Sequence, residues 1–133
     1  MKAHKILYRI SIATLVLVAS TALYFLYSII VADFRLNTPL SSERSEVART
    51  ENQMLHFDYC TNVKATVNYQ LIDGQIIDLA QETTVSGCDK KDKSVLIPPT
   101  INKGKYKLRV IASYQILFIK YEKSYDTSYF NVK

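Results

Sequence analysis

The sequence of 133 residues contains no tryptophan, and only three glycines, three prolines, two cysteines and two histidines. So few glycines exclude the glycine-rich loops that cradle phosphate groups in nucleotide-binding proteins. A metal site needs His, Cys, Asp or Glu clustered at fixed spacings, and the sequence shows no such cluster. We therefore predict no cofactor, no metal site and no nucleic-acid partner.

A marked catalytic centre is also missing. His56 precedes Asp58 by two residues, so on a strand the two side chains would share one face. Nucleophilic catalysis would require a hydroxyl or thiol beside this pair, and the sequence marks none. We interpret His56 as a surface residue, predict no catalytic residues and expect that the protein is not an enzyme.

Charged residues are absent from a long apolar run, Ile10 to Ala32. About 20 such residues span the core of a bilayer as a helix. Lys2, Lys5 and Arg9 precede the run, and positive residues beside a span stay cytoplasmic. The sequence therefore predicts a single pass through the inner (plasma) membrane, with a cytoplasmic tip over 1–9, a transmembrane helix over 10–32 and an extracytoplasmic remainder.

The same run could instead belong to a cleaved signal peptide. The apolar core of a signal peptide is about 7–15 residues long, and this run is longer. Cleavage after Ala32 would release a soluble, secreted binding or inhibitor domain. We favour the uncleaved anchor on the criterion of length and keep the secreted domain as the alternative.

Both cysteines, Cys60 and Cys88, lie after the apolar run. Two cysteines in a small exported domain are typical of one disulfide, because oxidising compartments favour the bond. Closing a loop of about 29 residues would stabilise the fold by about 3–4 kcal/mol in the chain-entropy model.

Polar and charged residues dominate 33–54, which we interpret as a linker or stalk of undetermined structure. The remainder, 55–133, shows strand patterns. Apolar residues alternate with polar ones from Val63 to Leu71, and Asp73-Gly74 is a strong turn signal. If paired residue numbers sum to 148, the apolar faces of both strands coincide. This register places Leu71 opposite Ile77, Tyr69 opposite Leu79, Val63 opposite Val85 and Cys60 opposite Cys88.

Further along, we predict a charged loop over 88–94 and a short strand over 95–97, stopped by two prolines. A longer strand follows, with apolar residues at even positions from Tyr106 to Tyr114. Its basic residues at 103, 105, 107 and 109 are interpreted as a solvated strand face. The last strand is placed near 129–132.

The stretch 96–110, LIPPTINKGKYKLRV, resembles the turn into the penultimate strand of immunoglobulin-like and fibronectin type III-like sandwiches. In those folds a tyrosine at this turn bonds back to the upstream backbone. Tyr106, with Gly104 two residues before it, matches that layout. The resemblance covers about 55–133 and implies an antiparallel, all-β, Ig-like sandwich. The Cys–Trp–Cys core of antibody domains is missing, because the chain has no tryptophan.

The whole layout is similar to small membrane-anchored envelope proteins of bacteria and their phages. Like them, it has a basic tip, one span and a compact domain. This resemblance implies a binding or assembly role in the cell envelope, with the lipid bilayer and an envelope protein as partners.

The segment that looks most like a binding surface is 114–129, which links the last two strands and is long for a hairpin loop. Tyrosine-rich loops on a rigid sandwich commonly bind partners. We predict a partner-contacting loop over 116–125, although for Phe118 itself we favour a place in the core. The candidate contact residues are Phe118, Lys120, Tyr121, Lys123 and Tyr125.

Overall fold

A computed structural model describes residues 2–133, and the chain divides between Ala32 and Asp33 into two compact units. The first unit is one helix, α1 (Lys2–Val31). Within it, Lys2–Tyr27 is long and apolar enough to cross a membrane. Helix α1 begins at Lys2, so the predicted tip over 1–9 is helical from that residue on, and Met1 lies outside the described residues. Thr14 and Thr21 donate hydrogen bonds to carbonyl oxygens one turn earlier, which satisfies their hydroxyl groups inside an apolar helix.

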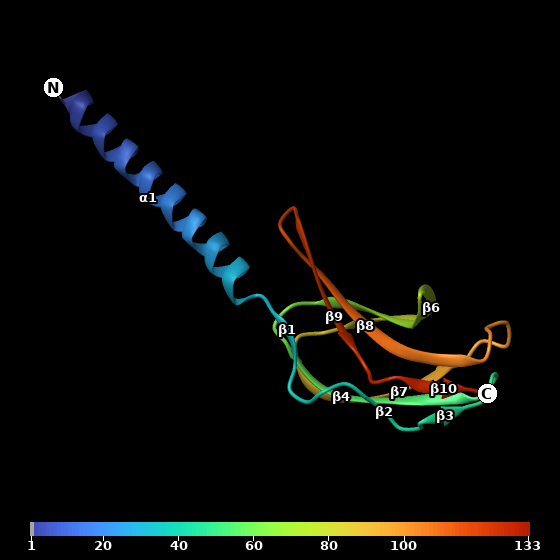
Figure 1. The fold of residues 1–133 in the computed structure, drawn as a ribbon. Helices are drawn as coiled ribbons and strands as arrows, with labels where there is room; N and C mark the ends of the chain where they lie inside the picture. The colour runs from blue at the N-terminus through green and yellow to red at the C-terminus, as the bar shows by residue number, and fades with distance from the viewer. Residues whose placement is uncertain (1) are drawn as a thin grey trace. The chain divides into compact units, whose positions relative to one another are not determined.

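The second unit is built entirely from strands, which form two sheets (Figure 1). In one sheet, β4 pairs with β7 along one edge and with β1 and β2 along the other. The other sheet has the order β3-β10-β8-β5-β6, and β9 also pairs with β8. The strands are β1 (Phe34–Leu36), β2 (Ser41–Ser42), β3 (Glu46–Val47), β4 (Asn52–Thr61), β5 (Ala65–Asp73), β6 (Gln75–Thr84), β7 (Gly87–Leu96), β8 (Gly104–Ile116), β9 (Ile119–Asp126) and β10 (Phe130–Val132).

Residues 52–96 form one long hairpin that bends from one sheet into the other. Near the turn, Leu71 pairs with Ile77, as the predicted register requires. Gly74 at the turn has a φ of 63°, a conformation that glycine adopts at little cost. The hairpin leaves the β5–β6 pair at 62–64 and 85–86 and continues as the β4–β7 pair, where Cys60 lies opposite Cys88.

Part of the predicted register is wrong. The pairing shifts by one residue between Tyr69 and Gln70, so Ala80 and not Leu79 lies opposite Tyr69. Val63 and Val85 lie in the bends between the two sheets and do not pair, and Val85 is 76% exposed. A β-bulge of this kind places one extra residue on one strand and increases the local twist, which suits a strand that is about to change sheets.

The core lies between the two sheets and is filled by alternate residues of β4, β5 and β8. The period of two predicted for β5 and β8 is confirmed, because one side of each strand is buried throughout. Tyr69, Leu71 and Leu108 are among the largest fully buried side chains. The buried alternate positions are 53, 55, 57, 59 and 61 of β4, 65, 67, 69 and 71 of β5, and 106, 108, 110, 112 and 114 of β8.

The prediction of a linker or stalk over 33–54 is wrong, because this segment belongs to the strand domain, which starts at Asp33. Phe34 and Val47 are buried at 0% and 1% exposure. Gln53 is fully buried and holds the backbone of Arg44 twice: its Nε2 donates to Arg44 O at 2.7 Å, and its Oε1 accepts from Arg44 N at 3.1 Å. This clamp fixes the passage from β2 on one sheet to β3 on the other.

The charged segment 88–94 is also a strand and not the predicted loop. It forms most of β7, which pairs with β4 over ten residues. In the described domain β7 has β4 as its one ladder partner, so its other edge is open. Charged side chains on such an edge discourage pairing with other chains, which explains why a strand here carries a loop-like composition.

The start of β8 is held by a bond from a tyrosine to the upstream backbone. The Tyr106 hydroxyl donates to Asn102 O at 2.7 Å, and the Tyr106 side chain is buried. Gly104 lies between the two residues with a φ of 155°, which L side chains rarely adopt. The bond closes the loop between β7 and β8.

We expect Tyr106→Phe to lower the free energy of unfolding by about 1 kcal/mol, the net value of one intramolecular hydrogen bond. Tyr129→Phe is the matched control, because Tyr129 is 62% exposed and phenylalanine keeps its ring contact with Lys107. That change should stay within about 0.5 kcal/mol. Urea unfolding of the full chain in detergent measures both, and equal effects would argue against a structural role for the hydroxyl.

Candidate functional site

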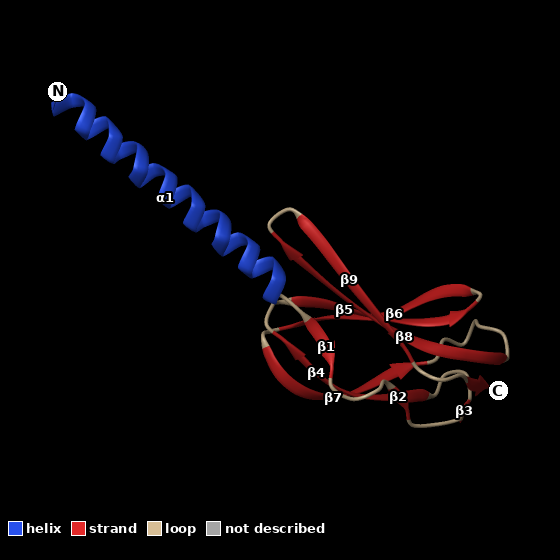
Figure 2. Cartoon of the chain, turned by 60° about the vertical axis from the view of Figure 1, so that its left-hand side comes forward, coloured by secondary structure: helices blue, strands red, loops and turns tan. Residues whose placement is uncertain are grey.

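The candidate partner-contacting segment is a tight hairpin and not the long loop that we expected. Strands β8 and β9 pair up to Ile116 and Ile119, which leaves only Leu117 and Phe118 in the turn. Pairing between β8 and β5 stops at Ser113, so the last part of the hairpin has two strands only. Figure 2 shows this end of β8 and β9 extending away from the other strands.

Three consecutive apolar residues form the end of this hairpin. Leu117 is 46% exposed, Phe118 97% and Ile119 49%. The expected place of Phe118 in the core is therefore wrong, because the turn carries its side chain beyond both sheets. We call Leu117, Phe118 and Ile119 the apolar tip.

The other predicted contact residues lie further down the hairpin and are largely engaged. Tyr121 stacks on Tyr114 with ring centroids 5.5 Å apart, just below the apolar tip. Lys120 forms an exposed ion pair with Glu122, 3.3 Å from Nζ to Oε1. The structure thus separates Phe118, which is free, from side chains that stabilise the hairpin itself.

Lys123 and Tyr125 connect the hairpin to the beginning of the domain. Lys123 forms an ion pair with Asp33, and this hydrogen bond raises the pKa of the Lys123 ammonium. The Tyr125 hydroxyl donates to Phe34 O at 3.2 Å. The hairpin is therefore attached to the residues at which the chain enters the domain.

The base of β9 is fixed by a cluster of opposite charges. Arg109 donates to Asp126 at 2.7 Å and 3.1 Å, and Lys107 Nζ lies 2.9 Å from the same carboxylate. The hydrogen bonds from Arg109 hold the pKa of Asp126 at about 2. Two of the four basic residues predicted as a solvated face are thus neutralised, while Lys103 and Lys105 are exposed.

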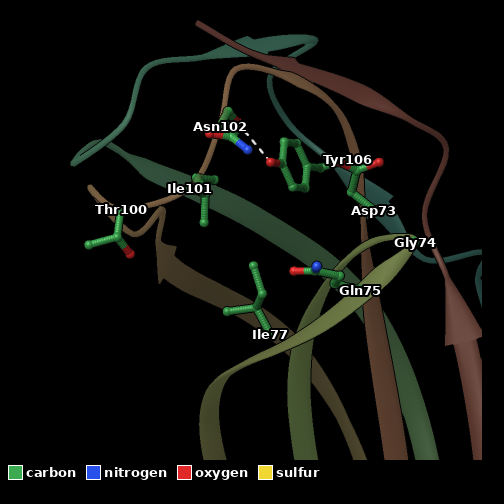
Figure 3. A pocket seen from close by; sticks show the side chains of 8 residues that line it. All are labelled: Asp73, Gly74, Gln75, Ile77, Thr100, Ile101, Asn102 and Tyr106. Atoms are coloured by element: carbon green, nitrogen blue, oxygen red, sulfur yellow. Dashed lines mark hydrogen bonds between the residues drawn. The ribbon is translucent and has the colours of Figure 1, made fainter.

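A shallow hollow lies beside Tyr106, between the β5–β6 turn and the loop that precedes β8 (Figure 3). Asp73 and Gln75 face it from the turn, and Thr100 and Asn102 from the loop. These groups can accept and donate hydrogen bonds. Their side chains include one carboxylate and no histidine or thiol, so the hollow lacks the paired groups that acid–base or nucleophilic catalysis uses.

His56 lies between two carboxylates on the outer face of β4. Its Nδ1 is 2.6 Å from Asp92 Oδ1, and its Nε2 is 3.3 Å from Glu43 Oε2. The hydrogen bond with Asp92 raises the pKa of His56 above its usual value. Its partners come from β7 and from the segment after β2, and not from Asp58, which the spacing allowed as a partner. His56 thus connects β4 to β7 through Asp92 and to the segment after β2 through Glu43.

The two sulfur atoms of Cys60 and Cys88 are bonded, with Cα atoms 4.1 Å apart on directly opposed positions of β4 and β7. Among residues 2–133, no group of three or more His, Cys, Asp or Glu side chains is placed to hold a metal ion.

Two members of the apolar tip, Leu117 and Ile119, lie within the predicted loop 116–125 but were not among its candidate contact residues. The apolar run 116–119 was visible in the sequence, but whether it is buried or exposed depends on where the hairpin turns. Two-residue hairpin turns usually carry glycine, asparagine or aspartate, and none of these occurs at 117 or 118. Leu117 itself adopts the left-handed conformation, with a φ of 57°.

No family model and no curated protein matches this chain. Among solved structures, it is similar to the alkylpurine DNA glycosylase AlkC of Pseudomonas fluorescens, determined in complex with DNA that contains an abasic-site analogue. The identity is 13%, the TM-score is 0.49, and the match covers 77% of this chain and 31% of that one.

Proposed function

We propose that this protein is a single-span membrane protein whose extracytoplasmic, Ig-like domain serves binding or assembly at the cell envelope. The observation that carries the proposal is the direct succession of two units. A helix long and apolar enough to span a membrane ends at Val31, and a disulfide-bonded strand domain starts at Asp33.

Strand order supports the Ig-like description. Such sandwiches place their first, second, fourth and fifth strands in one sheet and the third, sixth and seventh in the other. If β1–β3 count as one split strand and β9–β10 as another, six of the seven strands follow this order: β4 joins β2 and β7, while β8 joins β5 and β10. The fourth strand, β6, departs from it, because it pairs with β5 in the second sheet. The Tyr106 bond lies at the start of the sixth strand, where a tyrosine corner belongs. The disulfide differs from that of antibody domains, because it joins neighbours within one sheet.

Charge and redox chemistry support the orientation. Lys2, Lys5 and Arg9 lie at the start of α1 and favour a cytoplasmic location for that end. A disulfide on the other side agrees with an oxidising compartment. Both observations favour the same topology and depend on different residues.

The binding role rests on the apolar tip. Phe118 is almost fully exposed on a two-residue turn, beside two further half-exposed apolar side chains. An apolar side chain that contributes nothing to the core is better explained by an external contact than by folding. The contact surface that we propose is smaller than the segment 116–125, because the lower part of the hairpin is engaged within the domain.

We expect the full chain to remain with membranes after carbonate and high-salt extraction, because α1 spans the bilayer. Protease added to spheroplasts should digest the strand domain and leave a membrane-embedded fragment close to α1 in mass. Intact outer membranes provide the matched control, since they should protect the domain. Recovery of a soluble mature chain that starts near Asp33 would contradict the anchor and favour the secreted alternative.

A further inference from the structure

We infer that the apolar tip of the β8–β9 hairpin inserts into the lipid surface of the membrane that α1 spans, so that the domain has a second, reversible contact with the bilayer. This inference rests on the proposed function. It identifies lipid, and not an envelope protein, as the partner that the apolar tip contacts.

The composition of the hairpin end fits a membrane interface. Leu117, Phe118 and Ile119 form its outermost part, with exposures of 46%, 97% and 49%. Lys120 follows immediately, and the stacked Tyr114–Tyr121 pair lies below it. An apolar end followed by a lysine and then by stacked tyrosines combines side chains that favour acyl chains, anionic lipid headgroups and the interfacial region.

The hairpin is attached to the residues through which the strand domain continues from α1. Lys123 contacts Asp33, and only Ala32 separates Asp33 from the last residue of α1. Chain connectivity therefore keeps the domain end that carries Lys123 close to the end of the span. Phe118 is five strand residues from Lys123, which is about 17 Å at 3.3 Å per residue. The tip is thus connected to Asp33, just beyond α1, through one ion pair and about 17 Å of strand.

The backbone of the turn also favours a role for these side chains outside the domain. Leu117 adopts a φ of 57°, a left-handed conformation that is unfavourable for a residue other than glycine. Glycine or asparagine would relieve this strain and remove an exposed apolar group. Strained residues of this kind cluster at functional sites.

The shape of the tip favours lipid over protein. A stable protein interface buries about 800 Å² on each partner, from 20–30 residues. The apolar tip presents three consecutive residues on a convex, two-stranded end. A bilayer surface accepts such a protrusion without a complementary pocket, because its headgroups rearrange around the inserted side chains.

The absence of tryptophan permits a direct test with the full chain. Phe118→Trp introduces the single tryptophan of the protein at the apolar tip. The variant is reconstituted through α1 into vesicles of phosphatidylethanolamine and phosphatidylglycerol, with and without a lipid that carries a doxyl quencher near the headgroup. We expect blue-shifted emission and at least about twofold quenching.

Tyr129→Trp is the matched control, because Tyr129 is also an exposed aromatic residue but lies beside Lys107, nine residues down β8 from Ile116. That distance is about 30 Å along the strand, so the control should emit as in water and resist quenching. In the Phe118→Trp background, Leu117→Asn tolerates the left-handed backbone and removes apolar area. It should reduce the quenching severalfold.

The outcomes separate the inference from the function on which it rests. Vesicle flotation after carbonate treatment reports on α1. If the chain floats but the Phe118→Trp variant is unquenched and emits as in water, the inference is overturned and the membrane anchor stands. If the chain does not float, both fall together. Equal quenching in the Phe118→Trp and Tyr129→Trp variants would also overturn it, since no selective insertion of the tip would remain.

Discussion

Replacing Phe34 by alanine is expected to lower the free energy of unfolding by about 3–5 kcal/mol, the usual cost of emptying a buried phenylalanine site. Phe34 is fully buried, and its ring stacks on Tyr59 with centroids 5.4 Å apart. Its backbone also pairs with Thr61 of β4, so the vacated space cannot easily close. Chemical denaturation of the full chain in detergent, followed by near-ultraviolet circular dichroism, measures the change.

Arg35→Ala is the control for Phe34→Ala. Arg35 occupies the next position of the same strand, but its side chain is exposed. Its replacement should therefore change stability by less than about 0.5 kcal/mol. A loss below about 1 kcal/mol for Phe34→Ala would mean that 33–54 behaves as the linker that its polar composition indicates, and that the domain starts later.

Removal of the disulfide is expected to cost about 2–4 kcal/mol in the double variant Cys60→Ser, Cys88→Ser. The bond closes a loop with a sequence separation of 28 and thereby restricts the unfolded chain. Reducing agent should destabilise the natural protein by the same amount and leave the double variant unchanged. Thiols that react freely in the native, non-reduced protein would contradict both the bond and the oxidising location.

Much of the central hairpin could be predicted from the sequence because its signals are local. Alternation over 63–71 identified the buried face of β5, and Asp73-Gly74 located the turn. The bulge after Tyr69 left no local signal, because it depends on how the strand bends between two sheets. The one-residue shift in register is cancelled at the bend between the sheets. There, three residues, 62–64, connect β4 to β5, whereas only two residues, 85–86, connect β6 to β7. The predicted register therefore fails in the middle and holds again at Cys60 and Cys88.

The segment 33–54 could not be recognised as part of the fold because its strands are only two or three residues long. Buried residues such as Phe34, Leu40 and Val47 are six or seven positions apart, so no period of two develops. Gln53 is a polar residue in a buried position. The reason for its burial is its pair of hydrogen bonds with the Arg44 backbone, which the local sequence does not indicate. These elements depend on tertiary contacts that local sequence does not encode.

For the candidate segment 116–125, the sequence predicted a long loop, whereas the structure shows a tight hairpin. A leucine in a left-handed turn position violates the preference for glycine on which hairpin prediction relies. The apolar run then resembled core, although the turn directs Phe118 outward. The preference for glycine in hairpin turns thus fails at the residues for which we propose an external contact.

The bent hairpin over 52–96 also sets the order in which the domain can mature. Both cysteines lie on this one hairpin, and their alignment requires the Gly74 turn and the bend between the sheets but no residue of β8, β9 or β10. Contacts that are close in sequence form before distant ones, because shorter loops cost less entropy to close. A chain that crosses the membrane in sequence order can therefore oxidise its cysteine pair while its last third is still emerging. The covalent bond then holds two strands of each sheet in place as a template for the strands that arrive last.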